Sequence, residues 1–300
     1  MNITPQLFVP AITPFLPDLS VDTVRFVANC RVLLEEDGAH GLAPFGTTSE
    51  ANSLSVAERV EALEALLAAG LPANRLIPGT GCSALPDSIA LTRHAVSLGC
   101  LGVLALPPFY YKGVTDEGVF ASYARIIEAT GDPRLRLYLY HIPQISGVPI
   151  TLPLIERLLK AFPGNVVGLK DSSGDWDNTA AVIKAFPELA SYSASEALLA
   201  KNIAAGGAGC ISASANVQAR NIVSLIGAIG TAAEERIAGR VTAVRKIFEA
   251  LPLVPAIKAA TARRHADDGY RIVRPPLVAL SAEFTPQIDQ ALALSAPERT

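Results

Sequence analysis

The sequence predicts an α/β fold, namely a closed (β/α)₈ barrel, or TIM barrel, followed by a C-terminal helical extension. Eight short apolar segments alternate with amphipathic helical patterns. The segments are apolar on both faces, which is typical of parallel strands that are covered by helices. Beyond about residue 231 the pattern is helical only. No Gly-rich phosphate-binding motif follows a strand, which disfavours an open doubly wound sheet.

The strand segments recur along most of the chain. The candidate strands lie at 7–13, 40–46, 75–81, 102–108, 136–143, 166–171, 190–195 and 209–214. Because eight such strands can close on themselves at this chain length, we expect a catalytic barrel over residues 1–230. The helical remainder, residues 231–300, is expected to pack on that barrel.

Helical patterns between the strands carry their own start and stop signals. Clear examples lie at 21–36, 55–70 and 151–162. Ser55 and Glu58 have the spacing of a capping box, in which each side chain bonds the other's backbone N–H. Gly70 and Gly99 stand where helices are expected to end.

Composition and charge exclude several classes of function. Apolar residues make up 50% of the chain and charged residues 18%, with a net charge of −3 and no basic block. Nothing therefore indicates binding to nucleic acid or to an anionic membrane surface. The N-terminal stretch lacks the features of a signal peptide, and the longest uncharged run, 202–219, lacks the bulk of a transmembrane helix. We expect a soluble cytoplasmic protein.

Cysteine and histidine show no metal-binding pattern. The four cysteines form no C-x-x-C pair, and the four histidines are scattered without ligand spacing. The interpretation that we favour is buried free thiols in a reducing compartment, with no metal site.

The segment VVGLKDSSGD, residues 166–175, ends a buried strand on a lysine. Strand alternation places Gly168, Lys170 and Ser172 on one side and Leu169 and Asp171 on the other. Desolvation favours the neutral form of an amine, and a neutral amine attacks a ketone to form a Schiff base, which acts as an electron sink. The alternative is a strand-end lysine whose amine reaches solvent.

The neighbouring strand ends on a tyrosine. Tyr140 in YLYHIP is expected beside Lys170, where its phenol can carry protons during imine formation and C–C cleavage. Packing alone would also explain it. Tyr138 lies on the same side one layer deeper, so we expect it in the core.

Two more strand ends carry hydroxyl groups. The stretch GTTSE, residues 46–50, presents Thr47 and Thr48 with backbone N–H groups that can hold a carboxylate, although an ordinary Ser/Thr turn would look the same. In PPFYYKG, residues 107–113, two adjacent tyrosines either pack within the loop or reach a partner subunit.

The motifs GTTSE, PPFYYKG, YHIPQISG and GLKDSSGD, in this order and spacing, resemble the dihydrodipicolinate synthase/N-acetylneuraminate lyase family. Its members are Schiff-base, pyruvate-handling class I aldolases on a (β/α)₈ barrel, and the resemblance spans roughly residues 5–225. It implies that Lys170 forms the imine with a 2-oxo acid and that Tyr140 is the acid/base shuttle. Thr47 and Thr48 would hold the carboxylate and relay a proton. No metal or organic cofactor is implied.

The same resemblance implies an assembly. Tyr111 matches the tyrosine that members of the family insert into the neighbouring subunit, where it completes a Tyr–Thr–Tyr relay. At least a dimer is therefore implied, and a homotetramer is typical.

Departures from the family pattern bear on the substrate. Ile145 stands where the synthase branch usually has an Arg for the second substrate's carboxylate, and an apolar side chain cannot replace a guanidinium. Dihydrodipicolinate synthesis is therefore disfavoured, and Ser146–Gly147 resemble the lyase branch instead. His141 replaces the usual Asn without an assigned role, and Ser49 stands where Gly is usual.

Further positions resemble the lyase branch's substrate-binding residues. Ser172 matches a hydroxyl-binding Thr, Glu196 a polyol-binding Glu, and Ser195 stands where Asp is common. An acidic residue at a helix start, where the dipole stabilises it, is the alternative for Glu196. Ile211 in the last candidate strand completes the predicted substrate-binding set.

The function predicted from these residues is a pyruvate-type class I aldolase or lyase for a hydroxylated 2-oxo acid, such as a 2-keto-3-deoxy sugar acid. Lys170 would condense with C2, the C3–C4 bond would break, and Tyr140 with Thr48 would move the proton. Three alternatives stay open: a keto-deoxy acid dehydratase, dihydrodipicolinate synthase acting on pyruvate and aspartate semialdehyde, and a non-catalytic barrel that senses a 2-oxo acid.

Overall fold

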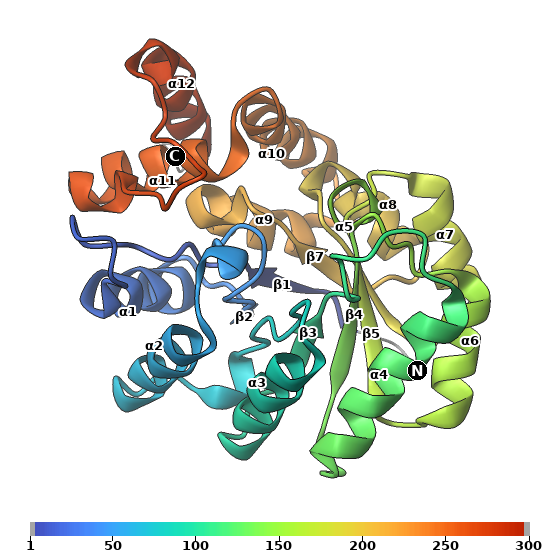
Figure 1. Ribbon diagram of the computed structural model, residues 1–300. Coiled ribbons are helices and arrows are strands. Elements are labelled where there is room, and N and C mark those ends of the chain that lie inside the picture. The colour runs from blue at the N-terminus through green and yellow to red at the C-terminus, as the bar shows by residue number, and fades with distance from the viewer. Residues whose placement is uncertain (1–3, 297–300) are drawn as a thin grey trace.

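A parallel sheet lies at the centre of the computed structural model, which describes residues 4–296, and helices surround it (Figure 1). The strands are β1 (Gln6–Val9), β2 (Gly41–Leu42), β3 (Val103–Ala105), β4 (Leu137–His141), β5 (Val166–Asp171), β6 (Ala190–Ser193) and β7 (Gly209–Ile211). They are ordered β2-β1-β7-β6-β5-β4-β3. The predicted α/β barrel class is confirmed.

The third of the eight predicted strands, 75–81, is wrong as a regular strand, although the segment lies between its predicted neighbours. It forms isolated bridges to both edges of the sheet, Leu42 with Leu76 and Gly79 with Leu104. The Leu104 amide also donates to the Pro78 carbonyl at 2.9 Å. Because proline has no N–H, Pro78 interrupts the ladder, and the segment closes the barrel without becoming a strand.

Several strands end earlier than predicted. The first ends at Val9 instead of residue 13, and the second at Leu42 instead of residue 46. Pro10 directly follows the first and Pro44 lies two residues beyond the second, and neither can donate to a neighbouring strand.

Helices follow the strands and cover the sheet. Those of the barrel are α1 (Thr23–Arg31), α2 (Val56–Ala68), α3 (Leu85–Ser97), α4 (Asp116–Thr130), α5 (Pro143–Ser146), α6 (Leu152–Ala161), α7 (Trp176–Ala185), α8 (Leu199–Ala204) and α9 (Ala215–Ala228). The predicted capping box at Ser55 and Glu58 is confirmed, with both reciprocal bonds present. Gly70 and Gly99 follow their helices with φ of 85° and 76°, a conformation that favours glycine.

A separate apolar cluster fills the inside of the barrel. It contains Phe8, Ala43, Ile77, Leu104, Tyr138, Tyr140, Ile142, Tyr192, Ala208 and Ile211. Gly168 gives Tyr138 its room, because a Cβ at that position would lie 2.3 Å from the tyrosine ring. The core position predicted for Tyr138 is confirmed, and Gly168 lies on the same side of β5 as Lys170.

The C-terminal helices form the extension, with α10 (Glu234–Glu249), α11 (Leu253–His265) and α12 (Thr285–Ser295) gathered on one side of the barrel (Figure 1). Their apolar side chains share a cluster with Ile12, Ala213 and Val217 of the barrel. The helical extension is therefore confirmed, while the boundary at residue 230 stays a prediction. No helix in the described part of the chain is long and apolar enough to cross a membrane.

Candidate active site

Two buried residues of adjacent strands form the centre of the site. Tyr140 in β4 is in register with Lys170 in β5, which in turn is in register with Tyr192 in β6. Lys170 is 4% exposed and Tyr140 3% exposed. The Lys170 Nζ lies 4.3 Å from the centre of the Tyr140 ring. The sequence prediction that these two side chains are neighbours is confirmed.

The Tyr140 phenol also contacts the GTTSE loop. Its oxygen lies 3.1 Å from Thr47 Oγ1, so amine, phenol and hydroxyl are brought together. Burial by itself would raise the pKa of Tyr140, but the charge of Lys170 and hydrogen bonds, that from Thr47 among them, outweigh burial and lower it. A phenol with a lowered pKa releases its proton more readily, as a proton shuttle must.

The hydroxyl of Ser172 is available to a ligand. Its Oγ is buried and has no hydrogen-bond partner of good geometry among the described residues, although it is near enough to help lower the pKa of Tyr140. Backbone contacts fix the residue: its N–H donates to the His141 carbonyl at 2.8 Å, and its carbonyl accepts from Gln144 Nε2 at 2.6 Å. A buried hydroxyl without a partner is unfavourable unless a bound group supplies one.

Ser49 anchors the loop that carries the two threonines. Its side chain is fully buried, and its Oγ donates to the Ala11 carbonyl at 2.6 Å. Thr13 Oγ1 in turn donates to the Ser49 carbonyl at 2.8 Å. A serine in place of glycine is thus explained, because its hydroxyl ties the loop to the chain that follows β1. Thr48, directly before it, is also buried.

A buried ion pair ties the same loop to α11. Lys258 Nζ pairs with the Glu50 carboxylate and donates to the Ile272 carbonyl at 2.6 Å. Burial lowers the pKa of Lys258 to about 8, against the opposing influence of Glu50. Sequence reasoning missed this residue, although a lone lysine within LVPAIKAATA is a signal of a buried, paired charge.

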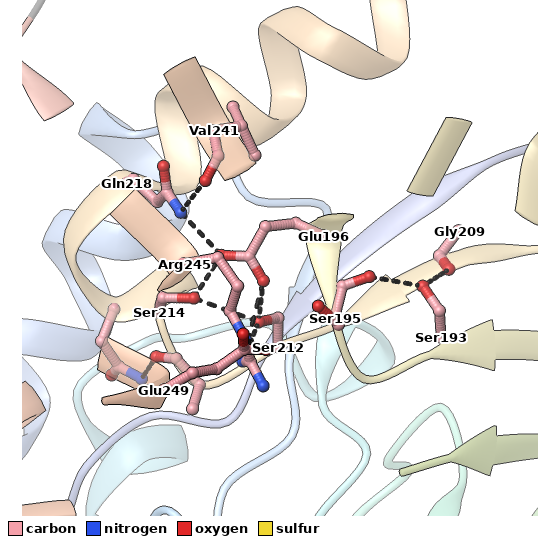
Figure 2. Close-up of polar contacts among 12 residues, drawn as sticks. Ser193, Ser195, Glu196, Gly209, Ser212, Ser214, Gln218, Val241, Arg245 and Glu249 are labelled. Atoms are coloured by element: carbon pink, nitrogen blue, oxygen red, sulfur yellow. Dashed lines mark hydrogen bonds and ion pairs between the residues drawn. The ribbon is translucent and has the colours of Figure 1, made fainter. Parts of the chain in front are cut away.

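Glu196 lies in a hydrogen-bond network instead of standing free (Figure 2). Its carboxylate, 1% exposed, accepts from Ser212, from Ser214 and, at 2.6 Å, from Gln218 Nε2, while Arg245 Nη1 lies 3.8 Å away. Protein donors therefore occupy both of its oxygens. This geometry favours a role in joining β7 and α9 to α10 over the predicted binding of a polyol.

The remaining predicted substrate residues are Ser195, two residues beyond β6, and Ile211, the last residue of β7. The Ser195 carbonyl accepts from Ser193 Oγ at 3.0 Å, as Figure 2 shows. Ile211 is fully buried in β7 and belongs to the interior cluster with Tyr140.

Tyr111 lies on an exposed loop. It is 71% exposed and stacks edge-to-face on Tyr110, with ring centres 5.3 Å apart. Lys112 holds this loop to α5 by donating to the Ser146 carbonyl at 2.7 Å. An exposed aromatic pair on a tethered loop is suited to a partner subunit, and the predicted contact stays a prediction.

His141 has a bracing role that the sequence did not reveal. It is 5% exposed, and its Nδ1 accepts the Ile150 N–H at 3.0 Å across the loop that follows β4. Burial lowers its pKa, so the ring is kept neutral, as an Nδ1 acceptor requires. Among residues 4–296, no group of three His, Cys, Asp or Glu side chains is arranged to hold a metal ion.

Comparison with known proteins shows which family the chain resembles. The profile of the Dihydrodipicolinate synthetase family matches residues 4–294. An uncharacterized DapA-like lyase of Chloroflexus aurantiacus is 36% identical over 91% of this chain and 90% of its own. A 4-hydroxy-tetrahydrodipicolinate synthase of Rhizobium meliloti is 36% identical over 71% of each chain.

A solved structure agrees with these relatives. The dihydrodipicolinate synthase of Agrobacterium tumefaciens superposes with a TM-score of 0.87 at 31% identity, over 96% of this chain and 98% of its own. Both the matched residues and the shared fold extend through the C-terminal helices. The chain belongs to the Dihydrodipicolinate synthetase family and is a lyase of that family.

Proposed function

We propose that the protein is a Schiff-base aldolase that cleaves or forms the C3–C4 bond of a 4-hydroxy-2-oxo acid, with pyruvate as one product. The observation that carries the proposal is the buried Lys170 amine beside the Tyr140 phenol and the Thr47 hydroxyl. None of the ion pairs among the described residues involves Lys170, so no carboxylate competes with a 2-oxo acid for this amine.

The proposed reaction begins with attack of the neutral Lys170 amine on C2 of the 2-oxo acid. Loss of water gives a protonated imine, which withdraws electrons from C3. Tyr140 accepts the proton of the C4 hydroxyl, the C3–C4 bond breaks and an aldehyde leaves. The electron pair enters the enamine, which is protonated at C3, and hydrolysis then releases pyruvate.

The hydroxyl groups divide between positioning and proton relay. The carboxylate of the substrate is assigned to the Thr47–Thr48 turn. Because it is Thr47 whose hydroxyl contacts Tyr140, the relay step that the sequence prediction gave to Thr48 is better assigned to Thr47. Ser172, with its free buried hydroxyl, is assigned to the C4 hydroxyl of the substrate. Tyr111 of a second subunit would complete the relay in a homotetramer.

Two narrower substrates follow from the sequence and the relatives. A 2-keto-3-deoxy sugar acid was predicted from Ser172, Ser195 and Glu196, and the last of these is occupied by protein donors. Dihydrodipicolinate synthesis is supported by the names of relatives such as that of R. meliloti, but Ile145 offers no charge to a second carboxylate.

The proposal is tested by release of pyruvate from a panel of 4-hydroxy-2-oxo acids, monitored with coupled lactate dehydrogenase. We expect pyruvate and an aldehyde in equal amounts. A dehydratase would yield a dehydrated 2-oxo product without pyruvate. A sensor would yield neither product, and either result would contradict the proposal.

A further inference from the structure

A cavity of about 490 Å³ opens directly beside the proposed reaction centre. One wall is Thr47, the residue whose hydroxyl contacts Tyr140, and another is Ile145 in α5, just after the strand that carries Tyr140. The C-terminal extension supplies the rest through residues 252–255 and 276–281 and Phe284. Its volume falls within the range of pockets for small organic ligands, about 300–1,000 Å³.

The residues that line this cavity are almost all apolar. Apart from Thr47 and Ser281, every residue that lines the cavity is apolar, and Ser281 Oγ accepts the Glu283 N–H at 3.5 Å. Ile145 and Val278 are 60% and 77% exposed, which is unusual for large apolar side chains unless they meet a ligand or a partner. A polyol chain placed here would lose its hydrogen bonds to water and find few replacements.

The one carboxylate that sequence reasoning offered to a polyol does not line this cavity. Glu196 is fully engaged with Ser212, Ser214 and Gln218, so it neither faces the cavity nor has an oxygen to spare. The polar end of the substrate therefore stays at Lys170 and the threonine turn, while the other end meets an apolar wall.

We propose that this cavity binds an apolar substituent on C4 of the substrate, so that the aldehyde partner is a branched alkyl or aryl aldehyde instead of a polyhydroxy aldehyde. The inference rests on the proposed aldolase function and refines its substrate class. In the condensation direction the enamine carbon of the Lys170–pyruvate adduct forms a bond to the aldehyde carbon. The aldehyde oxygen takes the proton that Tyr140 holds, and hydrolysis of the imine frees the product.

The test measures kcat/KM for addition of pyruvate to isovaleraldehyde, benzaldehyde and glyceraldehyde. We expect the two apolar aldehydes to be favoured by roughly tenfold or more, the discrimination that an apolar pocket gives. The variant Val278→Asp should lower kcat/KM for them by roughly tenfold, because a carboxylate in the wall must be desolvated. Val24→Asp is the matched control, since Val24 is 79% exposed on α1 and outside the cavity.

Borohydride trapping of the pyruvate imine, run on the same samples, separates the two possible failures. Trapping that persists while glyceraldehyde is preferred, or while Val278→Asp changes nothing, would overturn the apolar subsite and leave the aldolase proposal standing. Absence of any trapped pyruvate in the unaltered protein would overturn both.

Discussion

Two lysines among residues 4–296 are almost completely buried, and they differ in whether a carboxylate pairs with the amine. Lys170 is 4% exposed and Lys258 is fully buried. Each amine lies over an aromatic ring, 4.3 Å from the centre of Tyr140 for the first and 4.2 Å from that of Phe15 for the second. Within the described part of the chain, Lys258 has a carboxylate partner, Glu50, and no ion pair involves Lys170.

The comparison teaches that the partners of a buried amine, and not its burial, separate a structural lysine from a reactive one. Lys258 is enclosed by α11 and the GTTSE loop, so its ammonium is paired and no ketone can reach it. Lys170 lies over the ring of Tyr140, whose phenol in turn contacts Thr47 and lies near Ser172. The lowered pKa of Lys258 would by itself nominate that residue, whereas the proposed mechanism uses Lys170.

The largest expected effect is the loss of turnover when Lys170 is replaced. Lys170→Ala should reduce turnover by roughly 10⁴-fold or more, because the proposed imine cannot form without this amine. The free energy of unfolding should stay within about 1 kcal/mol of the unaltered protein, since no ion pair is lost. Lys184→Ala, on the exposed face of α7, is the control. Retained turnover in Lys170→Ala would refute the mechanism.

Removal of the Tyr140 phenol should have the second largest effect on catalysis. Tyr140→Phe is expected to lower kcat by roughly 10²–10⁴-fold, the usual contribution of a positioned acid or base, while the pyruvate imine still forms slowly. Tyr138→Phe is the matched control, because that ring lies one layer deeper in the same strand. Equal kinetics for the two variants would remove Tyr140 from the mechanism.

Breaking the ion pair between Lys258 and Glu50 should mainly lower the free energy of unfolding. Lys258→Met removes the ammonium that pairs with the buried Glu50 carboxylate and leaves it the Arg274 N–H at 3.0 Å. This should cost about 3–5 kcal/mol in the free energy of unfolding, measured in urea. The double variant E50Q/K258M should lose less than the single one, since no unpaired charge remains. A cost below about 1 kcal/mol for Lys258→Met would mean that the pair does not anchor the loop.

A smaller effect is expected at the exposed tyrosine. Tyr111→Phe should lower kcat by roughly tenfold through loss of one hydrogen bond in the relay, with assembly unchanged by size-exclusion chromatography. The control is Tyr110→Phe, at the equally exposed neighbouring position, which should leave kcat unchanged. The cross-subunit relay would be wrong if a monomeric form of the protein were fully active.

The smallest effect concerns the acid stability of the ion pair between Glu58 and Arg274. A hydrogen bond from Arg274 lowers the pKa of Glu58 from its ordinary 4.5 to about 2. Because the folded-state pKa lies below the unfolded one, this stabilisation is present above about pH 4.5 and is lost as pH falls toward 2. The advantage over Glu58→Gln, about 1 kcal/mol after solvent screening, should shrink over that range in unfolding titrations. A constant difference would contradict the assignment.

Local patterns predicted much of this arrangement. Alternation within one strand placed Tyr138 one layer beneath Tyr140, and the pairing of consecutive parallel strands placed Tyr140 beside Lys170. The break at Pro78 was also readable, since proline cannot donate to a ladder, and it was overlooked.

What the sequence could not reveal depends on contacts between distant segments. Glu196 is occupied by donors that α9 and α10 bring to it, and Lys258 finds Glu50 only when α11 packs on the barrel. The apolar cavity likewise arises where the C-terminal extension meets Thr47 and Ile145. Neither periodicity nor motif spacing carries that information.

The most direct measurement is reduction with borohydride in the presence of pyruvate, followed by intact mass and peptide mapping. The account predicts one reduced pyruvate adduct per chain, located on Lys170, with none on Lys258. An adduct on Lys258, or no adduct on Lys170 under conditions where the enzyme turns over, would contradict it.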